Sequence, residues 1–501
     1  MSRKSQVASS ALFSALDPGA TKVSQPPSPS MIIVGKDVLE LLSSAMYVDP
    51  LTIYREYVQN AADAIDDARA AGVLAREAPG KVDITIDSGK RLIGIRDNGA
   101  GIPIAQATGR LLAIGASTKR GTRARGFRGV GRLAGLAYGR NLTFRTRAAG
   151  DKGVLELRWD CQRLKAALRD VRLSDDIGSV IQRVVTISHL DGDGWPTSFF
   201  EVELSDVIRT KRDALLSPSI VADYLSQIAP VPFDATFSWG REIEAHLAPV
   251  RLGNLEIRLE PNGVPLARPI TDAFKVSDTL TDTLGELELL TLTDLDGGVA
   301  GLGWLLHHSY LGSITVRSQI GGIRARVGNV QVGSENLLEE IFPETRFNSW
   351  AVGEVHVLDP RILPNARRDN FEQNVHYSNL TAQLEPLARQ IARRARAASI
   401  ARNNVRRAEL AAAALADAAG HRVTKGTNRD YPSTSEFRVD DAPTVSFASE
   451  RAADATAQIS EEAKLSLPQK QLVRRLRSVA LQSGLSKDEL KDVYAHLRDV
   501  S

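Results

Sequence analysis

The feature that most constrains this chain is a helix that carries three polar side chains on a single face. In the segment REYVQNAADAI, Glu56, Asn60 and Asp63 are spaced i, i+4 and i+7, which stacks them on one side of an α-helix. Burying such groups without partners would cost several kcal/mol. The stripe is therefore expected either to face solvent or to line a wet pocket.

A strand followed by a glycine turn comes next. IRDNGAGIP places Asp97 at the end of a strand, with Gly99 and Gly101 directly after it. Alternating glycines allow the backbone to turn and lie flat against a ligand, and a carboxylate at such a strand end can accept a hydrogen bond from an exocyclic amine. The same letters also describe an ordinary turn after a strand.

A third motif, RGFRGVGRLAGLAYG, places Gly126, Gly129 and Gly131 before an apolar helical run. A glycine-rich loop that leads into a helix N-terminus presents backbone N–H groups and a positive dipole end to phosphate. The motif lacks the early strand–turn–helix position of a dinucleotide fold, and the chain contains no GxxxxGK[ST] sequence. Both common nucleotide-binding folds are therefore disfavoured.

The first half of the chain mixes helical and strand periodicities from Ile32 to about Leu204. KVDITID and RLIGIRD alternate with period two, and the intervening Ser88-Gly89 predicts a hairpin. NLTFRTR, GVLELRW, SVIQRVVTISHL and SFFEVEL continue the strand series, while VLELLSSAMYVDP and LTIYREYVQNAADAIDDARAAG have helical spacing. This pattern predicts an α+β domain in which helices cover one mostly antiparallel sheet.

A second α+β segment is expected from about Ala235 to Glu372, where LEIRLEPNGVPL, VAGLGWLLHHS, GGIRARVGNVQVG and WAVGEVHVLDP are strand-like. His307 and His308 lie on one of these apolar runs and are expected to be structural. An Ala- and Arg-rich stretch from Tyr377 predicts a long helix, and a linker without periodicity follows it. The predicted divisions are a flexible arm (1–30), a first domain (31–230), a second domain (231–376), a long helix (377–419), a linker (420–460) and a C-terminal helical segment (461–501).

Composition limits the classes of protein to which the chain can belong. Its 501 residues suit two or three domains. The net charge of +3, from 63 basic and 60 acidic residues, makes no case by itself for a nucleic-acid or membrane partner. The single cysteine, Cys161, excludes an intramolecular disulfide and is expected in the core. Because no apolar run approaches a membrane span, a soluble cytoplasmic protein is expected.

In this order and spacing, the three motifs resemble the N-box, G1 box and G2 box of the gyrase, heat-shock chaperone, histidine kinase and MutL (GHKL) superfamily. The resemblance covers Val38 to Phe144, includes a lid-like IGASTK segment, and is greatest to the heat shock protein 90 family. It implies an α+β fold: a Bergerat-fold ATPase sandwich, with helices on a mixed, mostly antiparallel sheet, then an α+β middle domain and C-terminal helices.

The resemblance also implies roles for individual residues. Glu56 would be the general base for the attacking water, and Asn60 would supply an oxygen to Mg²⁺. Asp97 would receive the adenine amino group, with Asp63 nearby and Thr197 helping to hold adenine, although proline precedes Thr197 where the family has glycine. The other nucleotide-binding positions implied are Gly99, Gly101, Ser117, Thr118, Lys119, Gly126, Phe127, Arg128, Gly129, Val130 and Gly131.

The segment LPNARRDNFE in the second domain resembles the catalytic loop of the chaperone family's middle domain. This implies that Arg368, or else Arg367, reaches the γ-phosphate and neutralises charge on the transferring group. The alternative is that both arginines pair with Asp369 and Glu372 at the surface.

By resemblance, the chain would be a slow, Mg²⁺-dependent ATPase working as a homodimeric clamp on a protein client, with the lid and the N-terminal domains closing on ATP. An alternative is a clamp on nucleic acid resembling MutL or the Morc-type ATPases, and a third possibility is one subunit of a bacterial system such as genome defence. The nucleic-acid alternative depends on a basic helix, for which a solvated face is the simpler explanation. Its arginines are Arg389, Arg393, Arg394, Arg396, Arg402, Arg406 and Arg407.

Overall fold

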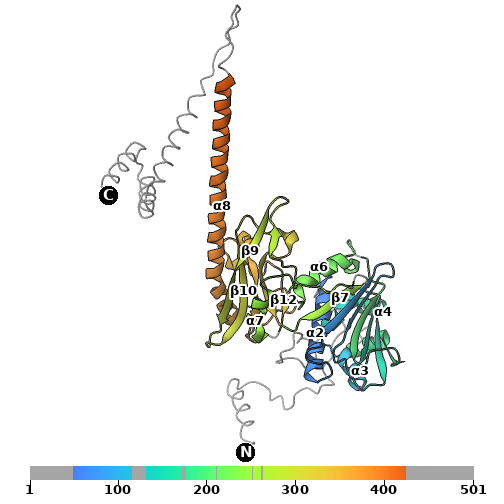
Figure 1. Ribbon diagram of the computed structural model, residues 1–501. Helices are drawn as coiled ribbons and strands as arrows, with labels where there is room; N and C mark the ends of the chain where they lie inside the picture. Colours follow the sequence, from blue (N-terminus) through green and yellow to red (C-terminus); the bar gives the residue numbers. More distant parts are fainter. Residues whose placement is uncertain are drawn as a thin grey trace, which may run out of the picture. The chain divides into compact units, whose positions relative to one another are not determined.

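The computed structural model describes residues 49–114, 131–170, 176–209, 212–250, 252–260 and 263–424 (Figure 1). The predicted N-terminal arm, most of the predicted linker and the predicted C-terminal helical segment lie outside these residues. The predicted α+β class is confirmed, because the described chain contains helices and two sheets with both parallel and antiparallel strand pairs. No helix in this part of the chain is both long and apolar enough to span a bilayer.

The first sheet has seven strands in the described residues, in the order β5-β4-β3-β6-β2-β1-β7. The predicted hairpin is confirmed, because β1 and β2 pair antiparallel with Ile84 opposite Ile95. Every neighbouring pair is antiparallel except β1 and β7. The strands are β1 (Gly80–Asp87), β2 (Leu92–Asp97), β3 (Asn141–Arg147), β4 (Gly153–Asp160), β5 (Val185–Asp191), β6 (Phe199–Ser205) and β7 (Leu255–Glu260).

Strand β7 was expected in the second α+β segment, but it extends the first sheet instead. It pairs in parallel with β1, with Leu255 opposite Gly80. Its burial alternates between inside and outside, as expected for a strand with one face on a core. The sequence pattern identified the strand correctly, but its partner is 175 residues away in the chain, counted from Gly80 to Leu255, and periodicity carries no information about such pairings.

Helices cover one face of the first sheet (Figure 1). Strand β1 alternates buried and exposed residues, so the opposite face is open to solvent. Helix α2 carries the polar stripe on one side and packs its apolar residues into the main core through Ile53, Val58 and Ile65. The helices are α2 (Thr52–Ala70), α3 (Ile104–Leu112), α4 (Cys161–Arg169), α5 (Ile177–Val184) and α6 (Pro218–Ile228).

One local prediction in this region was wrong. SVIQRVVTISHL was expected to be a strand, but its first half is helix α5, and β5 begins only at Val185. Asp176 caps that helix by accepting the N–H of Ser179, and Val180 and Val184 are buried one turn apart. The apolar run after the third glycine motif is helical as expected, and it forms a 3₁₀ helix, η3 (Gly131–Ala137).

The second sheet has six strands in the described residues, in the order β12-β11-β13-β10-β9-β8. Its central strand β10 is buried on both faces, with Leu305 in one core cluster and Trp304 and Leu306 in another. This explains why its sequence is a continuous apolar run. The strands are β8 (Ala273–Lys275), β9 (Thr281–Thr293), β10 (Val299–His308), β11 (Gly322–Val327), β12 (Val330–Val332) and β13 (Val352–Val357), and a short helix α7 (Gly240–His246) precedes them.

The predicted long helix is α8 (Val375–Thr424), whose first part lies along this sheet (Figure 1). Leu380, Leu384, Ala388 and Ile391 are buried at helical spacing and form one of the sheet's two cores. From Ile400 onward the side chains described, up to residue 414, are mostly exposed. The helix is therefore anchored through its first half.

Buried polar groups and the single cysteine behave as expected for structural residues. The imidazole of His307 lies 2.6 Å from the Tyr310 hydroxyl, and that of His308 lies 2.8 Å from Asp282 Oδ2. Cys161 is fully buried at the start of α4, and burial raises the pKa of its thiol to about 12. These contacts fit structural roles for all three side chains.

Candidate functional site

The polar stripe of α2, formed by Glu56, Asn60 and Asp63, lies at the border between the core and the solvent-accessible surface. Asp63 is 3% exposed, whereas Glu56 and Asn60 are half-buried. The first residue of η3 approaches this stripe closely, because a Cβ added to Gly131 would lie 2.2 Å from Glu56 Oε2. The last glycine of the third motif therefore lies directly against the carboxylate of the first.

Asp97 ends β2 as a nearly isolated buried carboxyl group. It is 5% exposed, and its Oδ1 accepts the backbone N–H of Gly99 at 2.8 Å. Burial raises the pKa of Asp97 to about 7, despite the N–H groups of Gly99 and Phe200, which lower it. Such a group has unused hydrogen-bonding capacity toward a ligand, and near neutral pH it exchanges readily between its charged and neutral forms.

The glycine turn after Asp97 is wedged between α2 and β3. Ala100 donates its N–H to Ala64 O at 3.0 Å, which fastens the turn to the helix that bears the stripe. Gly101 has φ +63°, and a Cβ there would lie 2.0 Å from Arg147 O. Any other residue at this position would displace the turn, so the second motif is held beside the first by backbone contacts that require glycine.

The Arg367–Arg368 loop meets α2 through Arg55. The Arg55 guanidinium places Nη2 at 2.9 Å from Arg367 O and 3.3 Å from Glu56 Oε1, with Nη1 3.5 Å from Arg368 O. Arg55 is 7% exposed and Arg368 is 8% exposed. Arg368 also has φ +56°, an uncommon conformation for a non-glycine residue. The loop backbone and Glu56 are therefore joined by one buried guanidinium.

The two arginines of this loop differ in exposure. Arg368 is buried, whereas Arg367 is exposed. Of the two acidic residues proposed as surface partners, Asp369 accepts a hydrogen bond from Asn365 Nδ2 at 2.7 Å. Arg368 and Glu372 each take part in an interaction within the described chain. The role implied for Arg368, with Arg367 as the exposed alternative, and the pairing with acidic neighbours both stay predictions.

Comparison with known proteins bears on this arrangement directly. Residues 52–178 match the family model for the "Histidine kinase-, DNA gyrase B-, and HSP90-like ATPase". The matched range contains the stripe, Asp97, the glycine turn and Gly131. No curated protein matches the chain. Residues 52–178 therefore resemble a GHKL-type ATPase domain. Domains of this class bind ATP, generally together with Mg²⁺.

Sequence reasoning missed three residues that support the site of the ATPase domain. Arg55 was overlooked because its partners in the Arg367–Arg368 loop lie more than 300 positions away, as the separation of 312 from Arg367 shows. Thr146 Oγ1 accepts the Ile102 N–H at 2.8 Å and donates to Phe199 O, and Ser198 Oγ donates to Gly99 O. The sequence signal for these two residues was a hydroxyl side chain in or next to a strand: Thr146 lies in β3, and Ser198 lies just before β6.

Thr197, the hydroxyl expected to hold adenine, is exposed in the bend just before β6. The neighbouring Ser198 turns toward the glycine turn instead. The role of Thr197 stays a prediction. Ser117, Thr118, Lys119, Gly126, Phe127, Arg128, Gly129 and Val130 lie outside the described residues, and their assignments stay predictions as well.

The donor set of the candidate site fits a magnesium ion that would arrive with a nucleotide. Asn60 offers one amide oxygen, one turn after Glu56. Across the described ranges, no three His, Cys, Asp or Glu side chains gather into a metal cage. Because Mg²⁺ retains waters and takes phosphate oxygens, one protein oxygen beside the phosphates is a suitable contribution.

The basic helix α8 uses several of its arginines within the protein. Arg402 donates to Tyr310 O and lies 5.9 Å from the centre of the Trp350 ring. Arg393, Arg406 and Arg407 are exposed. The remaining arginines form the ion pairs Arg389–Glu385, Arg394–Glu286 and Arg396–Glu344.

Proposed function

We propose that this protein hydrolyses ATP to ADP and phosphate with Mg²⁺, and that ATP binding gates a dimeric clamp on a protein client. The observation that carries the proposal is the set of contacts from Arg55 to Glu56 and to the Arg367–Arg368 loop. These contacts bring the backbone of a distant loop to the residue beside the predicted base. A site assembled from two such regions can be switched by their relative movement.

Four residues of the chain would each have one role in ATP binding or hydrolysis. Asp97 would accept the adenine amino group, since it is the buried carboxyl group with unused capacity. Glu56 would orient and deprotonate the attacking water. Arg368 would neutralise charge on the γ-phosphate. Bound Mg²⁺, held through Asn60, would supply charge neutralisation at the phosphates.

The ion pairs of α8 support a protein client over nucleic acid. A helix that neutralises DNA or RNA phosphates needs free arginines along one stripe. Arg389, Arg394 and Arg396 are already paired with carboxylates, which leaves Arg393, Arg406 and Arg407 as exposed cations. Binding of DNA at low salt that falls steeply at moderate salt would instead favour the nucleic-acid clamp.

Hydrolysis by the purified full chain tests the enzymatic part of the proposal. We expect Mg²⁺-dependent release of phosphate from wild type, and we expect Glu56→Gln to bind ATP without cleaving it. Asp67→Asn is the matched control, because Asp67 is exposed on the same helix. Loss of turnover in Arg368→Ala, but not in Arg367→Ala, would support the role of the buried arginine. Normal turnover in Glu56→Gln would contradict the proposal.

The clamp requires a separate measurement. Light scattering of Glu56→Gln with and without ATP should show an ATP-dependent rise in mass to that of a dimer, because the variant traps the nucleotide-bound state. A mass that stays that of a monomer with ATP bound would contradict the clamp and leave the ATPase intact.

A further inference from the structure

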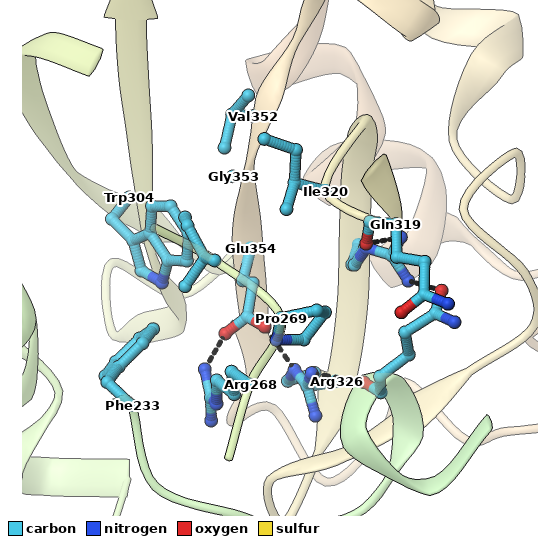
Figure 2. Close-up of a pocket in the computed structure, with 13 residues that line it drawn as sticks. Phe233, Arg268, Pro269, Trp304, Gln319, Ile320, Arg326, Val352, Gly353 and Glu354 are labelled. Carbon is cyan, nitrogen blue, oxygen red and sulfur yellow. Dashed lines mark hydrogen bonds and ion pairs between the residues drawn. The ribbon is translucent and has the colours of Figure 1, made fainter. Parts of the chain in front are cut away.

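Buried polar contacts join elements that are distant in sequence in both parts of the molecule. In the second sheet, Glu354 accepts hydrogen bonds from Arg268 and Arg326 (Figure 2). Beside the first sheet, the Tyr57 hydroxyl joins α2 to η3. Tyr57 directly follows Glu56 in the chain, so this second contact lies next to the predicted base although Tyr57 is not part of the polar stripe.

The Tyr57 hydroxyl bridges one turn of the backbone of η3. Tyr57 is 3% exposed, and its Oη accepts the Gly135 N–H at 2.9 Å and donates to Arg132 O at 3.2 Å. Arg132 and Gly135 are three residues apart, which is the spacing of the hydrogen bond that a 3₁₀ helix forms within itself. The hydroxyl therefore joins this N–H and this carbonyl from the side of α2, as side chains do where they insert into a helix.

A glycine allows the hydroxyl to approach η3 this closely. A Cβ added to Gly135 would lie 2.5 Å from Tyr57 Oη and 3.0 Å from Leu142 Cδ1. Any larger residue would therefore displace the hydroxyl or the helix. Glycine in a helix interior is less favourable than alanine by roughly 1 kcal/mol, and the contact with Tyr57 accounts for its presence in the run LAGLA.

The same helix also lies against Glu56. Gly131 is the first residue of η3, and a Cβ added there would lie 2.2 Å from Glu56 Oε2. Glu56 and Tyr57 are consecutive residues of α2, and they contact η3 at two successive points. Arg132, whose carbonyl accepts from the hydroxyl, directly follows Gly131. A shift at the hydroxyl bridge therefore moves the backbone beside the Glu56 carboxylate.

We propose that Tyr57 is a positioning residue for ATP hydrolysis, because its hydroxyl fixes the backbone of Gly131 against the carboxylate of Glu56. The inference rests on the proposed function, in which Glu56 is the base. A catalytic group must be held within about 0.5 Å of its productive position, and a displacement of about 1 Å can cost on the order of a hundredfold in rate. Without the hydroxyl, the first turn of η3 closes on itself and Gly131 moves relative to Glu56.

Tyr57→Phe removes only the hydroxyl, and steady-state kinetics beside equilibrium ATP binding on the full chain measures the effect. We expect kcat to fall about tenfold, between the effect of one lost hydrogen bond and that of a 1 Å displacement. ATP affinity should stay at the wild-type level, because Asp97 and the glycine turn are unchanged. Unchanged kcat, or a loss of affinity alone, would overturn the proposal.

Tyr54→Phe is the matched control. It removes a buried hydroxyl from the same helix, and that hydroxyl donates to Leu215 O at 2.6 Å and not to η3. We expect this variant to lose a similar amount of stability and to keep wild-type turnover. An equal fall of kcat in Tyr54→Phe and Tyr57→Phe would show that the effect comes from general destabilisation, and it would overturn the role of Tyr57.

Gly135→Ala tests the same contact from η3 and covers the case that Tyr57→Phe does not fold. Its Cβ would meet the hydroxyl, so kcat should fall in this variant as well. Gly109→Ala, in α3 at a position with open space around it, should turn over as wild type does. Gly135→Ala should cost less in the Tyr57→Phe background than in wild type, because the bridge is already lost. Additive losses would contradict a shared bridge.

Hydrogen exchange distinguishes a failure of this inference from a failure of the proposed function. The Gly135 amide should exchange faster in Tyr57→Phe than in wild type, and at the wild-type rate in Tyr54→Phe. A wild type that hydrolyses ATP while Gly135 exchanges equally in all three proteins would overturn the role of Tyr57 and leave the ATPase intact. A wild type without turnover would instead contradict the proposed function, whatever the exchange at Gly135.

Discussion

Two carboxyl groups in this protein are about equally buried and have opposite electrostatic characters. Asp97 is 5% exposed and Glu354 is 4% exposed. Burial raises the pKa of Asp97 to about 7, since only backbone N–H groups oppose it. Burial alone would raise that of Glu354 too, but Arg268 and Arg326 hold the pKa of Glu354 well below its usual value. For these two carboxyl groups, the charged partners and not the depth of burial determine the charge state.

This difference separates a structural carboxylate from one that is available to a ligand. Glu354 accepts from two guanidinium groups and joins the second sheet to the end of α6. Asp97 faces no described cation and keeps its capacity beside the glycine turn. A buried acid without a counter-ion, in a turn that only glycine can form, is a candidate for binding, whereas a buried acid between arginines is a candidate for stability.

The largest expected effect comes from a substitution of Glu354, the carboxylate with the structural role. Glu354→Gln should destabilise the fold by roughly 3–5 kcal/mol, because it leaves Arg268 and Arg326 buried without a counter-charge. Urea unfolding measures this. Glu344→Gln, which removes an exposed partner of Arg396, is the control and should cost about 1 kcal/mol or less. Equal costs for the two variants would refute the structural role of Glu354.

The pH dependence of stability should have opposite signs for the two acids. The folded-state pKa of Asp97 lies above its ordinary value of 3.8, so its stabilising contribution is complete below about pH 4 and is lost as pH rises through about 7. Between pH 5 and 7, wild type should lose stability relative to Asp97→Asn, by at most about 1.4 kcal/mol per pH unit.

Glu354 should behave differently in the same experiment. Its contribution is present above the unfolded pKa of about 4.5 and is lost only as pH falls through its lowered folded pKa. The urea midpoints of wild type and Glu354→Gln, measured from pH 5 to 8, should therefore run nearly parallel. Parallel curves for wild type and Asp97→Asn would show that Asp97 is not a lone buried acid.

A smaller effect is expected at Glu56, a carboxylate with one guanidinium partner. Arg55→Lys keeps the charge but loses the fork that reaches Glu56 Oε1 and the carbonyls of Arg367 and Arg368. We expect ATP turnover to fall about tenfold, or ~1.4 kcal/mol, with ATP affinity unchanged. Steady-state kinetics beside equilibrium binding distinguishes the two, and a loss of affinity alone would rule out a positioning role for Arg55.

Local pattern was enough to predict the secondary structure that carries the first two motifs but not what surrounds them. The spacing of Glu56, Asn60 and Asp63 fixed their shared helix face, and the position of Asp97 at a strand end followed from the period-two run before it. Arg55, Thr146 and Ser198 escaped notice because their partners are distant in sequence or are backbone groups. Such contacts depend on strand order and on packing between segments, which periodicity does not encode.

The second sheet shows the same limit of prediction from local pattern. The strands at residues 299–308, 322–327 and 352–357 were each recognisable from sequence. Their neighbours were not, since β11 lies beside β13 in parallel and the two are separated by a long connection. Only that pairing places Arg324 opposite Glu354, so this contact between strands could not be foreseen from the run GGIRARVGNVQVG.

Calorimetric titration of ATP into wild type and Asp97→Asn tests the central claim most directly. Wild type should bind ATP, and Asp97→Asn should bind about tenfold more weakly, because the amide oxygen can still accept from the adenine amino group but the charge that strengthens this hydrogen bond is lost. Asp83→Asn, an exposed carboxylate on the neighbouring strand β1, should bind as wild type does. Absence of adenine-nucleotide binding by wild type, or equal affinity in Asp97→Asn, would contradict an ATP site built around Asp97.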